Sequence, residues 1–172
     1  MSEELGDWSI DPKLVEYIEW ALPEGSTILE LGSGYGTQVL ADLGYEMHSV
    51  EHQLEYVGKY NSSYIYAPLE EMKPVRNHPK ATSWYNRDKL AGGLDGLHYD
   101  LLLIDGPPAH RSGFIKYFTM FDPKAIMVFD DLQRDRERKI CHSIAGRLNT
   151  WYVTYAAGTR KPFGVINDPR TK

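Results

Sequence analysis

Three glycines alternate with other residues in the segment 30–36, which reads Glu-Leu-Gly-Ser-Gly-Tyr-Gly. The segment follows an apolar run, 27–31, that predicts a buried strand, and it precedes a stretch, 37–43, that predicts a helix. Glycines here let the chain turn sharply and let a ligand approach the backbone, while the free N–H groups of the helix start suit a carboxylate. A tight turn without a ligand is the alternative. The residues expected to line this glycine loop are Glu30, Gly32, Ser33, Gly34, Gly36 and Thr37.

The next expected strand, 46–51, ends on an acidic residue, Glu51. A carboxylate about 20 residues after such a loop can accept hydrogen bonds from both hydroxyls of a ribose. His52 follows directly, and we include it in the candidate binding site with its role left open. A solvated carboxylate at a strand end is the alternative for Glu51. The glycine spacing departs from the dinucleotide fingerprint, which places its third glycine one position later.

Three carboxylates are expected at the ends of two further strands. Asp105 follows the apolar run 100–104, and Asp130 and Asp131 follow the run 125–129. Ligands bind outside the carboxyl ends of parallel strands, which lie about 4.8 Å apart, so these side chains can converge. Converging carboxylates repel one another unless a positive charge lies between them, and a hard divalent cation such as Mg²⁺ is the natural candidate. Capping of strand ends and of the next helix is the alternative.

His110 lies a few residues after Asp105 and is followed by Arg111. Because the pKa of a histidine lies near neutrality, His110 is a candidate general base, with a solvent-exposed loop histidine as the alternative. Arg134 belongs to a run of mixed charge, which is typical of a solvated helix face but could also hold an anionic substrate. Trp84 and Tyr85 are expected either to wall a pocket or to fill the edge of the core.

Short strand patterns alternate with helical ones along the chain, which predicts an α/β fold around a parallel sheet. The run 100–104 is apolar almost throughout, as expected for a strand covered on both faces. Stretch 70–96 is irregular and predicts a loop with a short helix at most. The predicted helices are 11–22, 37–43, 54–60, 115–121 and 133–148, and the predicted strands are 27–31, 46–51, 63–67, 100–104, 125–129 and an antiparallel pair at 151–155 and 163–166.

The composition is that of an ordinary globular domain. The chain has 172 residues, 42% hydrophobic and 25% charged residues, and a formal net charge of -5, so electrostatics give no reason to expect a nucleic acid or an anionic membrane as partner. A single cysteine, Cys141, excludes an internal disulfide and a cysteine-based zinc cluster. The first ten residues lack the apolar core of a signal peptide, and no apolar run has membrane-spanning length. We expect one domain spanning 1–172, in the cytoplasm.

Together these features resemble the class I S-adenosylmethionine-dependent methyltransferases over residues 8–138. The family's first motif is similar to ILELGSGYGT, its acidic second motif to HSVEHQ, and its fourth and fifth strands to YDLLLIDGPP and AIMVFDD. The resemblance implies a Rossmann-like three-layer sandwich, with a mostly parallel seven-stranded sheet whose final strand is antiparallel. It also implies S-adenosylmethionine as cofactor, with Gly32 and Gly34 near its methionine part, Glu51 on its ribose, Asp105 nearby, and Pro68, Leu69 and Glu70 at its adenine.

The acidic cluster is similar to that of metal-dependent O-methyltransferases acting on catechols and macrolide sugars. The resemblance implies that Asp105, Asp130 and Asp131 hold Mg²⁺, which binds the substrate hydroxyl and lowers its pKa. Those relatives often carry a lysine near this point, whereas here none occurs before Lys116. The loop Asp-Gly-Pro-Pro after 104 differs from the D/N-P-P-Y loop of nucleic-acid amino-methyltransferases, because it contains an extra glycine and lacks the stacking aromatic residue.

The sequence therefore predicts a methyltransferase that acts on the oxygen of a small molecule, with Asp105 and His110 as catalytic residues. The chain offers little beyond the core fold, so a homodimer or a partner subunit could complete the substrate pocket. The alternatives are a protein that binds S-adenosylmethionine without catalysis, a nucleic-acid or protein methyltransferase, and a nucleotide-dependent oxidoreductase.

Overall fold

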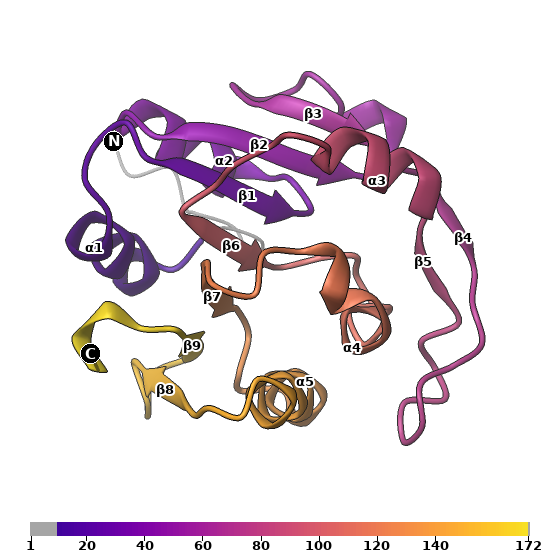
Figure 1. The fold of residues 1–172 in the computed structure, drawn as a ribbon. Coiled ribbons are helices and arrows are strands. Elements are labelled where there is room, and N and C mark those ends of the chain that lie inside the picture. Colours follow the sequence, from indigo (N-terminus) through magenta and orange to yellow (C-terminus); the bar gives the residue numbers. More distant parts are fainter. Residues whose placement is uncertain (1–9, 172) are drawn as a thin grey trace.

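A seven-stranded sheet forms the centre of the protein, as seen in the computed structural model, which describes residues 10–171 (Figure 1). Its strand order is β3-β2-β1-β6-β7-β9-β8. Neighbouring strands pair in parallel from β3 to β7, whereas β9 pairs antiparallel with both β7 and β8. The strands are β1 (Thr27–Leu31), β2 (Glu46–Glu51), β3 (Ser63–Tyr66), β6 (Leu101–Ile104), β7 (Ile126–Phe129), β8 (Tyr152–Tyr155) and β9 (Phe163–Ile166).

Residues 10–171 contain five α-helices, which flank this sheet, and three 3₁₀ turns. The α-helices are α1 (Pro12–Ala21), α2 (Tyr35–Asp42), α3 (Arg87–Leu94), α4 (Gly113–Tyr117) and α5 (Asp135–Arg147). The 3₁₀ turns are η1 (Leu54–Tyr56), η2 (Phe118–Met120) and η3 (Pro169–Thr171). Helix α1 begins where its sequence predicts, because the Asp11 side chain accepts a hydrogen bond from the Lys13 N–H (2.8 Å) and Pro12 needs no partner for its nitrogen.

One face of the sheet is covered by α1 and α2. Side chains of a strand point alternately to opposite faces, so Leu101 and Leu103 of β6 face this layer. They pack in one cluster with Leu14 and Ile18 of α1 and with Leu40 of α2. This layer brings the start of α2 close to the ends of β1 and β6, where the glycine loop lies.

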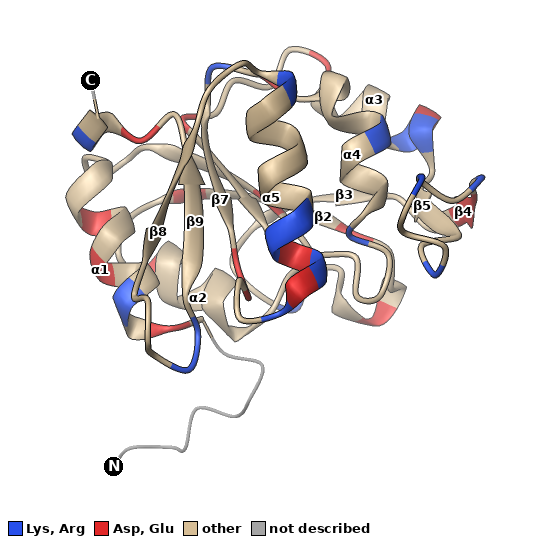
Figure 2. Cartoon of the chain, turned by 90° about the horizontal axis from the view of Figure 1, so that it is seen from below, with Lys and Arg blue, Asp and Glu red and all other residues tan. Residues whose placement is uncertain are grey.

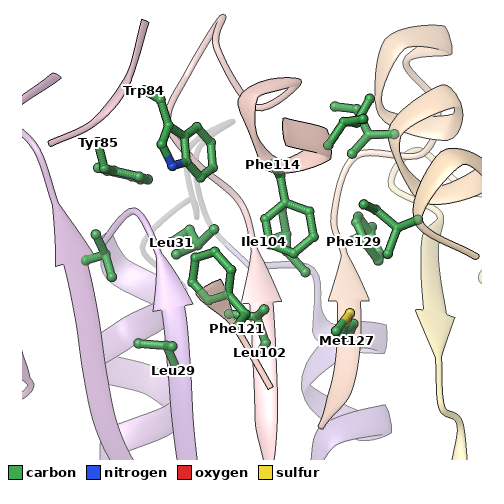
Figure 3. Packing of buried hydrophobic residues seen from close by; sticks show 14 of the residues in the cluster. Leu29, Leu31, Trp84, Tyr85, Leu102, Ile104, Phe114, Phe121, Met127 and Phe129 are labelled. Carbon is green, nitrogen blue, oxygen red and sulfur yellow. The ribbon is translucent and has the colours of Figure 1, made fainter. Parts of the chain in front are cut away.

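The other face is covered by α3, α4 and α5. Leu102 and Ile104 of β6 face this side, where they join a cluster with Leu90 of α3, Phe114 of α4 and Ile144 of α5. Figure 3 shows the aromatic rings of this cluster lying over the apolar side chains of the central strands. Two apolar clusters on opposite faces make the protein a three-layer sandwich, which confirms the predicted fold class.

The predicted helix 54–60 is wrong beyond its first turn. Only η1 forms there, and Gly58 adopts a left-handed φ of +79°. None of the three residues of η1 is buried, and Leu54 is 66% exposed, so the apolar spacing has no surface against which to pack.

The predicted loop 70–96 contains more structure than its sequence indicates. Strands β4 (Leu69–Glu71) and β5 (Ser83–Tyr85) form a separate antiparallel pair, and α3 follows. The Asn86 side chain caps α3 by accepting from the Lys89 N–H (2.9 Å). Strands of three residues are too short to show an alternating pattern, which is why the sequence did not reveal them.

Charged side chains lie mainly on the helices and on the connections between elements (Figure 2). Helix α5 begins with residues of both signs, and Asp135 pairs with Lys139 (2.6 Å) and with Arg138 (3.4 Å). Within residues 10–171, no helix combines the length and the apolar character needed to cross a membrane.

Candidate functional site

A small cavity opens where the carboxyl ends of β1, β6 and β7 meet the start of α2. Its volume is about 30 Å³. The glycine loop lines one side, and two of the three predicted acidic-cluster residues, Asp105 and Asp130, line the other. The lining residues are Ile10, Leu14, Glu30, Gly32, Gly34, Gly36, Thr37, Leu103, Asp105 and Asp130. The structure therefore brings together two groups that lie about 70 residues apart in sequence.

The glycine loop is shaped by close packing on one side and open space on the other. Gly32 has a left-handed φ of +88°, and a Cβ built on it would lie 3.4 Å from the Cα of Gly106. By contrast, a Cβ built on Gly34 would meet no atom within 4 Å. Gly34 N–H donates to the Thr37 hydroxyl (3.0 Å) at the start of α2. The loop thus leaves room for a ligand above Gly34.

The carboxylate of Glu51 binds the glycine loop directly. Its Oε2 accepts hydrogen bonds from the backbone N–H (3.1 Å) and the hydroxyl (2.9 Å) of Ser33. Its Oε1 accepts from the backbone N–H groups of His52 (2.8 Å) and Gln53 (3.0 Å). Burial raises the pKa of Glu51, but the nearby His52 side chain, together with the hydrogen bonds from Gln53 and Ser33, outweighs burial and lowers the pKa to about 2. Glu51 is therefore an anion at neutral pH and lies beside the loop.

Glu30 lies buried on the other side of the loop. Its Oε1 accepts hydrogen bonds from the hydroxyls of Thr37 (2.6 Å) and Ser49 (2.5 Å). The Ser49 hydroxyl in turn hydrogen-bonds with that of Ser62 (2.7 Å). Burial raises the pKa of Glu30 to about 8 despite these two bonds, so the carboxyl is mostly protonated at pH 7. Ser49 was not predicted as part of the site, because the strand EMHSVE mixes polar and apolar residues and the serine does not stand out in it.

The three predicted carboxylates do converge. Asp105, Asp130 and Asp131 each offer one oxygen, and these atoms all lie within 4.8 Å of one another. Asp130 and Asp131 are buried, whereas the side chain of Asp105 is 48% exposed. Burial, together with the neighbouring charges of Asp105 and Asp131, raises the pKa of Asp130 to about 7. Asp130 can therefore gain or release a proton near neutral pH.

Arg111 inserts its guanidinium into this acidic cluster. Its Nη2 donates to Asp105 Oδ1 (2.6 Å) and to Asp131 Oδ2 (3.2 Å). Arg134 Nη1 lies 3.0 Å from the same Asp131 oxygen, close to the cluster as its sequence context suggested. The contact between Arg111 and Asp105 was not predicted. In the sequence Arg111 is only the neighbour of His110, and its spacing from Asp105 does not indicate a hydrogen bond between them.

His110 lies beside the cavity rather than in its lining. Burial lowers the pKa of His110, and the charges of Arg136 and His52 lower it further. Its Nδ1 is buried and has no hydrogen-bond partner among residues 10–171. The ring of His52 lies near Glu51, with Nδ1 3.2 Å from Oε1 but without the geometry of a hydrogen bond.

The residues expected at an adenine lie just beyond β3. Pro68 and Leu69 are half-buried, and neither lines the cavity. Glu70 is engaged elsewhere, because its carboxylate binds Arg87 Nε (3.1 Å) and Asn86 Nδ2 (3.0 Å). Their role in cofactor binding stays a prediction.

Trp84 and Tyr85 belong to the core rather than to the cavity wall. Both are fully buried, and their rings pack edge to face with centroids 5.0 Å apart. Figure 3 shows them over the end of β1, close to Leu31. The Tyr85 hydroxyl lies against Gly106, where an added Cβ would be only 2.9 Å away. This packing leaves no space for a side chain at the first residue after Asp105.

The strand order, the antiparallel β9 and the glycine loop after β1 define the Rossmann-like fold of the S-adenosylmethionine-dependent methyltransferases. No family model and no curated protein matches the sequence. Solved structures do match.

The T. thermophilus 16S rRNA N2 G1207 methyltransferase, in complex with AdoMet and guanosine, has a TM-score of 0.56 at 14% identity, over 94% of this chain and 44% of the other. The MycE methyltransferase of the mycinamycin biosynthetic pathway, in complex with Mg and SAH, has a TM-score of 0.53 at 14% identity, over 89% and 44%. A TehB-like SAM-dependent methyltransferase from Corynebacterium glutamicum has a TM-score of 0.51 at 11% identity, over 89% and 85%. The chain spans less than half of the first two proteins, and at these identities the likeness shows the fold.

Proposed function

We propose that this protein is an S-adenosylmethionine-dependent methyltransferase that methylates a hydroxyl group of a small molecule. One observation carries the proposal: the ionised Glu51 binds one side of the glycine loop, while Asp105 and Asp130 share a cavity with its other side. The site thus combines a place for a nucleoside with groups that can act on an acceptor. Carboxylates turned outward as simple caps would have favoured binding without catalysis.

The residues present fit the cofactor. The open space above Gly34 and the nearby start of α2 suit its carboxylate, and Glu51 suits the ribose hydroxyls. A carboxylate has about four lone-pair positions, and those of Glu51 are taken by Ser33, His52 and Gln53. A ribose hydroxyl would replace the Ser33 hydroxyl, which can rotate away, whereas the backbone N–H groups stay in place. Pro68 and Leu69 would contact the adenine.

When bound, S-adenosylmethionine supplies an electrophilic methyl group. The chain's contribution is to orient the acceptor and to take its proton. Asp130 suits the second task better than His110, because it lines the cavity and its pKa of about 7 allows it to accept a proton at neutral pH. Asp105, more exposed at the same edge, would hold the acceptor hydroxyl through a hydrogen bond.

A divalent cation bound at the acidic cluster would lower the pKa of the acceptor hydroxyl. The carboxylate oxygens have the right chemistry for Mg²⁺. However, Arg111 already binds Asp105 and Asp131, so the cluster as arranged does not accommodate the ion.

Calorimetric titration with S-adenosylmethionine and S-adenosylhomocysteine tests the proposal. Both should bind, and NAD should not. Glu51→Gln should weaken binding about 10- to 100-fold, since a hydrogen bond to a charged group contributes about 1.5–3 kcal/mol. Glu55→Gln, an exposed carboxylate of the adjacent turn η1, is the matched control and should leave the affinity unchanged. Absence of heat with both nucleosides would contradict the proposal.

A nucleic-acid acceptor is the second candidate, favoured by the turn between β4 and β5. This turn carries Lys73, Arg76 and Lys80 without an acidic residue among them, and Figure 2 shows it at the edge of the molecule. Fluorescence anisotropy with a labelled RNA would support this candidate if binding weakened steeply with salt and with charge reversal of the three residues. If the protein does not bind RNA in this way, a nucleic-acid acceptor is excluded and the small-molecule acceptor remains the proposal.

A further inference from the structure

We propose that the guanidinium of Arg111 is the resident cation of the acidic cluster and that it takes the place of a divalent metal. The consequence of this arrangement for methyl transfer rests on the proposed function, but whether the cluster holds Arg111 or a metal ion can be tested without any cofactor. Arg111 would be a positioning residue, because it acts through Asp105 and Asp131 rather than on a substrate.

First, three of the oxygens that Asp105 and Asp131 could offer to a metal already have partners. Asp131 Oδ2 accepts from Arg111 and lies 3.0 Å from Arg134, and Asp131 Oδ1 accepts from Gln133 Nε2 (3.0 Å). Asp105 Oδ1 lies 2.6 Å from Arg111 Nη2. A Mg²⁺ ion binds its oxygens at about 2.0–2.1 Å, so an ion held between Asp105 Oδ1 and Asp131 Oδ2 would have to enter the space of Nη2.

Second, Arg111 is buried and depends on its acidic neighbours. The residue is 6% exposed, and behind it Glu137, 2% exposed, lies 4.0 Å from its Nη1. A buried cation left without partners is strongly destabilising. A metal that captured Asp105 and Asp131 would leave Arg111 with only the more distant Glu137 as an acidic partner and would also repel the guanidinium at close range.

Third, hydrogen bonds hold the loop that carries Arg111 on both sides. The Ser112 hydroxyl hydrogen-bonds with His78 Nδ1 (2.9 Å) of the β4–β5 turn. On the other side, Arg136 of α5 donates to the carbonyl oxygen of Ala109 (3.1 Å). These contacts hold Arg111 in the cluster and oppose its release to make room for an ion.

The test is a Mn²⁺ titration followed by electron paramagnetic resonance, with no cofactor present. The wild-type protein should leave the signal of free Mn²⁺ unchanged up to millimolar concentration. Arg111→Gln removes the guanidinium while keeping a polar side chain, and it should create one saturable Mn²⁺ site that is at least tenfold tighter. Adding Asp105→Asn to that variant should abolish the new site. Arg138→Gln removes a cation of α5 that pairs with Asp135 rather than with the acidic cluster, and this variant should bind no more Mn²⁺ than wild type.

Two results would overturn the proposal. One is saturable binding of one Mn²⁺ to the wild-type protein that Asp105→Asn removes. The other is a folded Arg111→Gln variant, verified by its circular dichroism, that gains no site. If Arg111→Gln does not fold, the Mn²⁺ titrations of the wild-type protein and of the Asp105→Asn variant decide the question. Absence of saturable Mn²⁺ binding to the wild-type protein then supports the proposal. Failure of S-adenosylmethionine to bind would contradict the proposed function and leave these Mn²⁺ results standing.

Discussion

Replacing Glu30 by glutamine should stabilise the protein at neutral pH and change how its stability depends on pH. The glutamine Oε1 can still accept the hydrogen bonds from Thr37 and Ser49. Its amide group can meet water, because Glu30 lines the cavity. What the substitution removes is the ionisation of a buried carboxyl group.

The size of the effect follows from the pKa of Glu30, which burial raises from 4.5 to about 8. The folded state holds the Glu30 proton more tightly than the unfolded state does. The stabilisation that this proton gives is therefore complete below pH 4.5, decreases as the pH rises from 4.5 to 8, and has been lost above pH 8. One pKa unit corresponds to about 1.4 kcal/mol, so by pH 7 the wild type should have lost about 3 kcal/mol that Glu30→Gln keeps. For a chain of this size that is roughly 10 °C in Tm.

Urea denaturation of both proteins at pH values from 5 to 8 measures this difference. The stability of Glu30→Gln relative to wild type should rise steadily over that range. Glu55→Gln is the matched control, since its carboxylate lies on the exposed turn η1, and its curve should run parallel to wild type. A pH-independent difference between Glu30→Gln and wild type would refute the reasoning that burial keeps Glu30 protonated.

Three further predictions concern the site and its support. Asp130→Asn should lower methyl transfer about 10²- to 10⁴-fold and abolish the rise of kcat with pH near 7 that the ionisation of Asp130 gives the wild type, as measured in a pH–rate profile. Gly106→Ala places a Cβ 2.8 Å from the Leu31 carbonyl oxygen, so urea denaturation should show a loss of about 1–3 kcal/mol, whereas Gly92→Ala, on an open helix face, should not destabilise. Glu51→Gln should lose the protection against thermal unfolding that S-adenosylmethionine gives the wild type.

The central sheet was predictable because its strands obey local rules. The stretches 27–31 and 46–51 match β1 and β2 residue for residue, and the apolar run at 100–104 marks a strand that is buried on both faces. The order of the strands came from the resemblance of the motifs, since neither spacing nor periodicity fixes which strands are neighbours. The helix predicted at 54–60 does not form beyond its first turn, because helical spacing of apolar residues is not sufficient where no surface is available for packing.

The positions of three carboxylates of the candidate site were predictable because these residues lie at the ends of parallel strands. Glu51, Asp105 and Asp130 end strands, and parallel strands present their carboxyl ends at one edge. The partners of these residues were not predictable, because they depend on how loops fold back. Arg111 reaches Asp131 across 20 residues, and Ser49 reaches Glu30 across 19, through contacts that only the tertiary structure creates.

A structure of the protein with bound S-adenosylhomocysteine tests the central claim most directly. We predict that a ribose hydroxyl lies within hydrogen-bonding distance of Glu51 in place of the Ser33 hydroxyl, that the ligand's carboxylate lies over Gly34, and that its sulfur points toward Asp105 and Asp130. A ligand bound elsewhere on the molecule, or a Glu51 carboxylate that keeps all its bonds to the loop and touches no ribose, would contradict it.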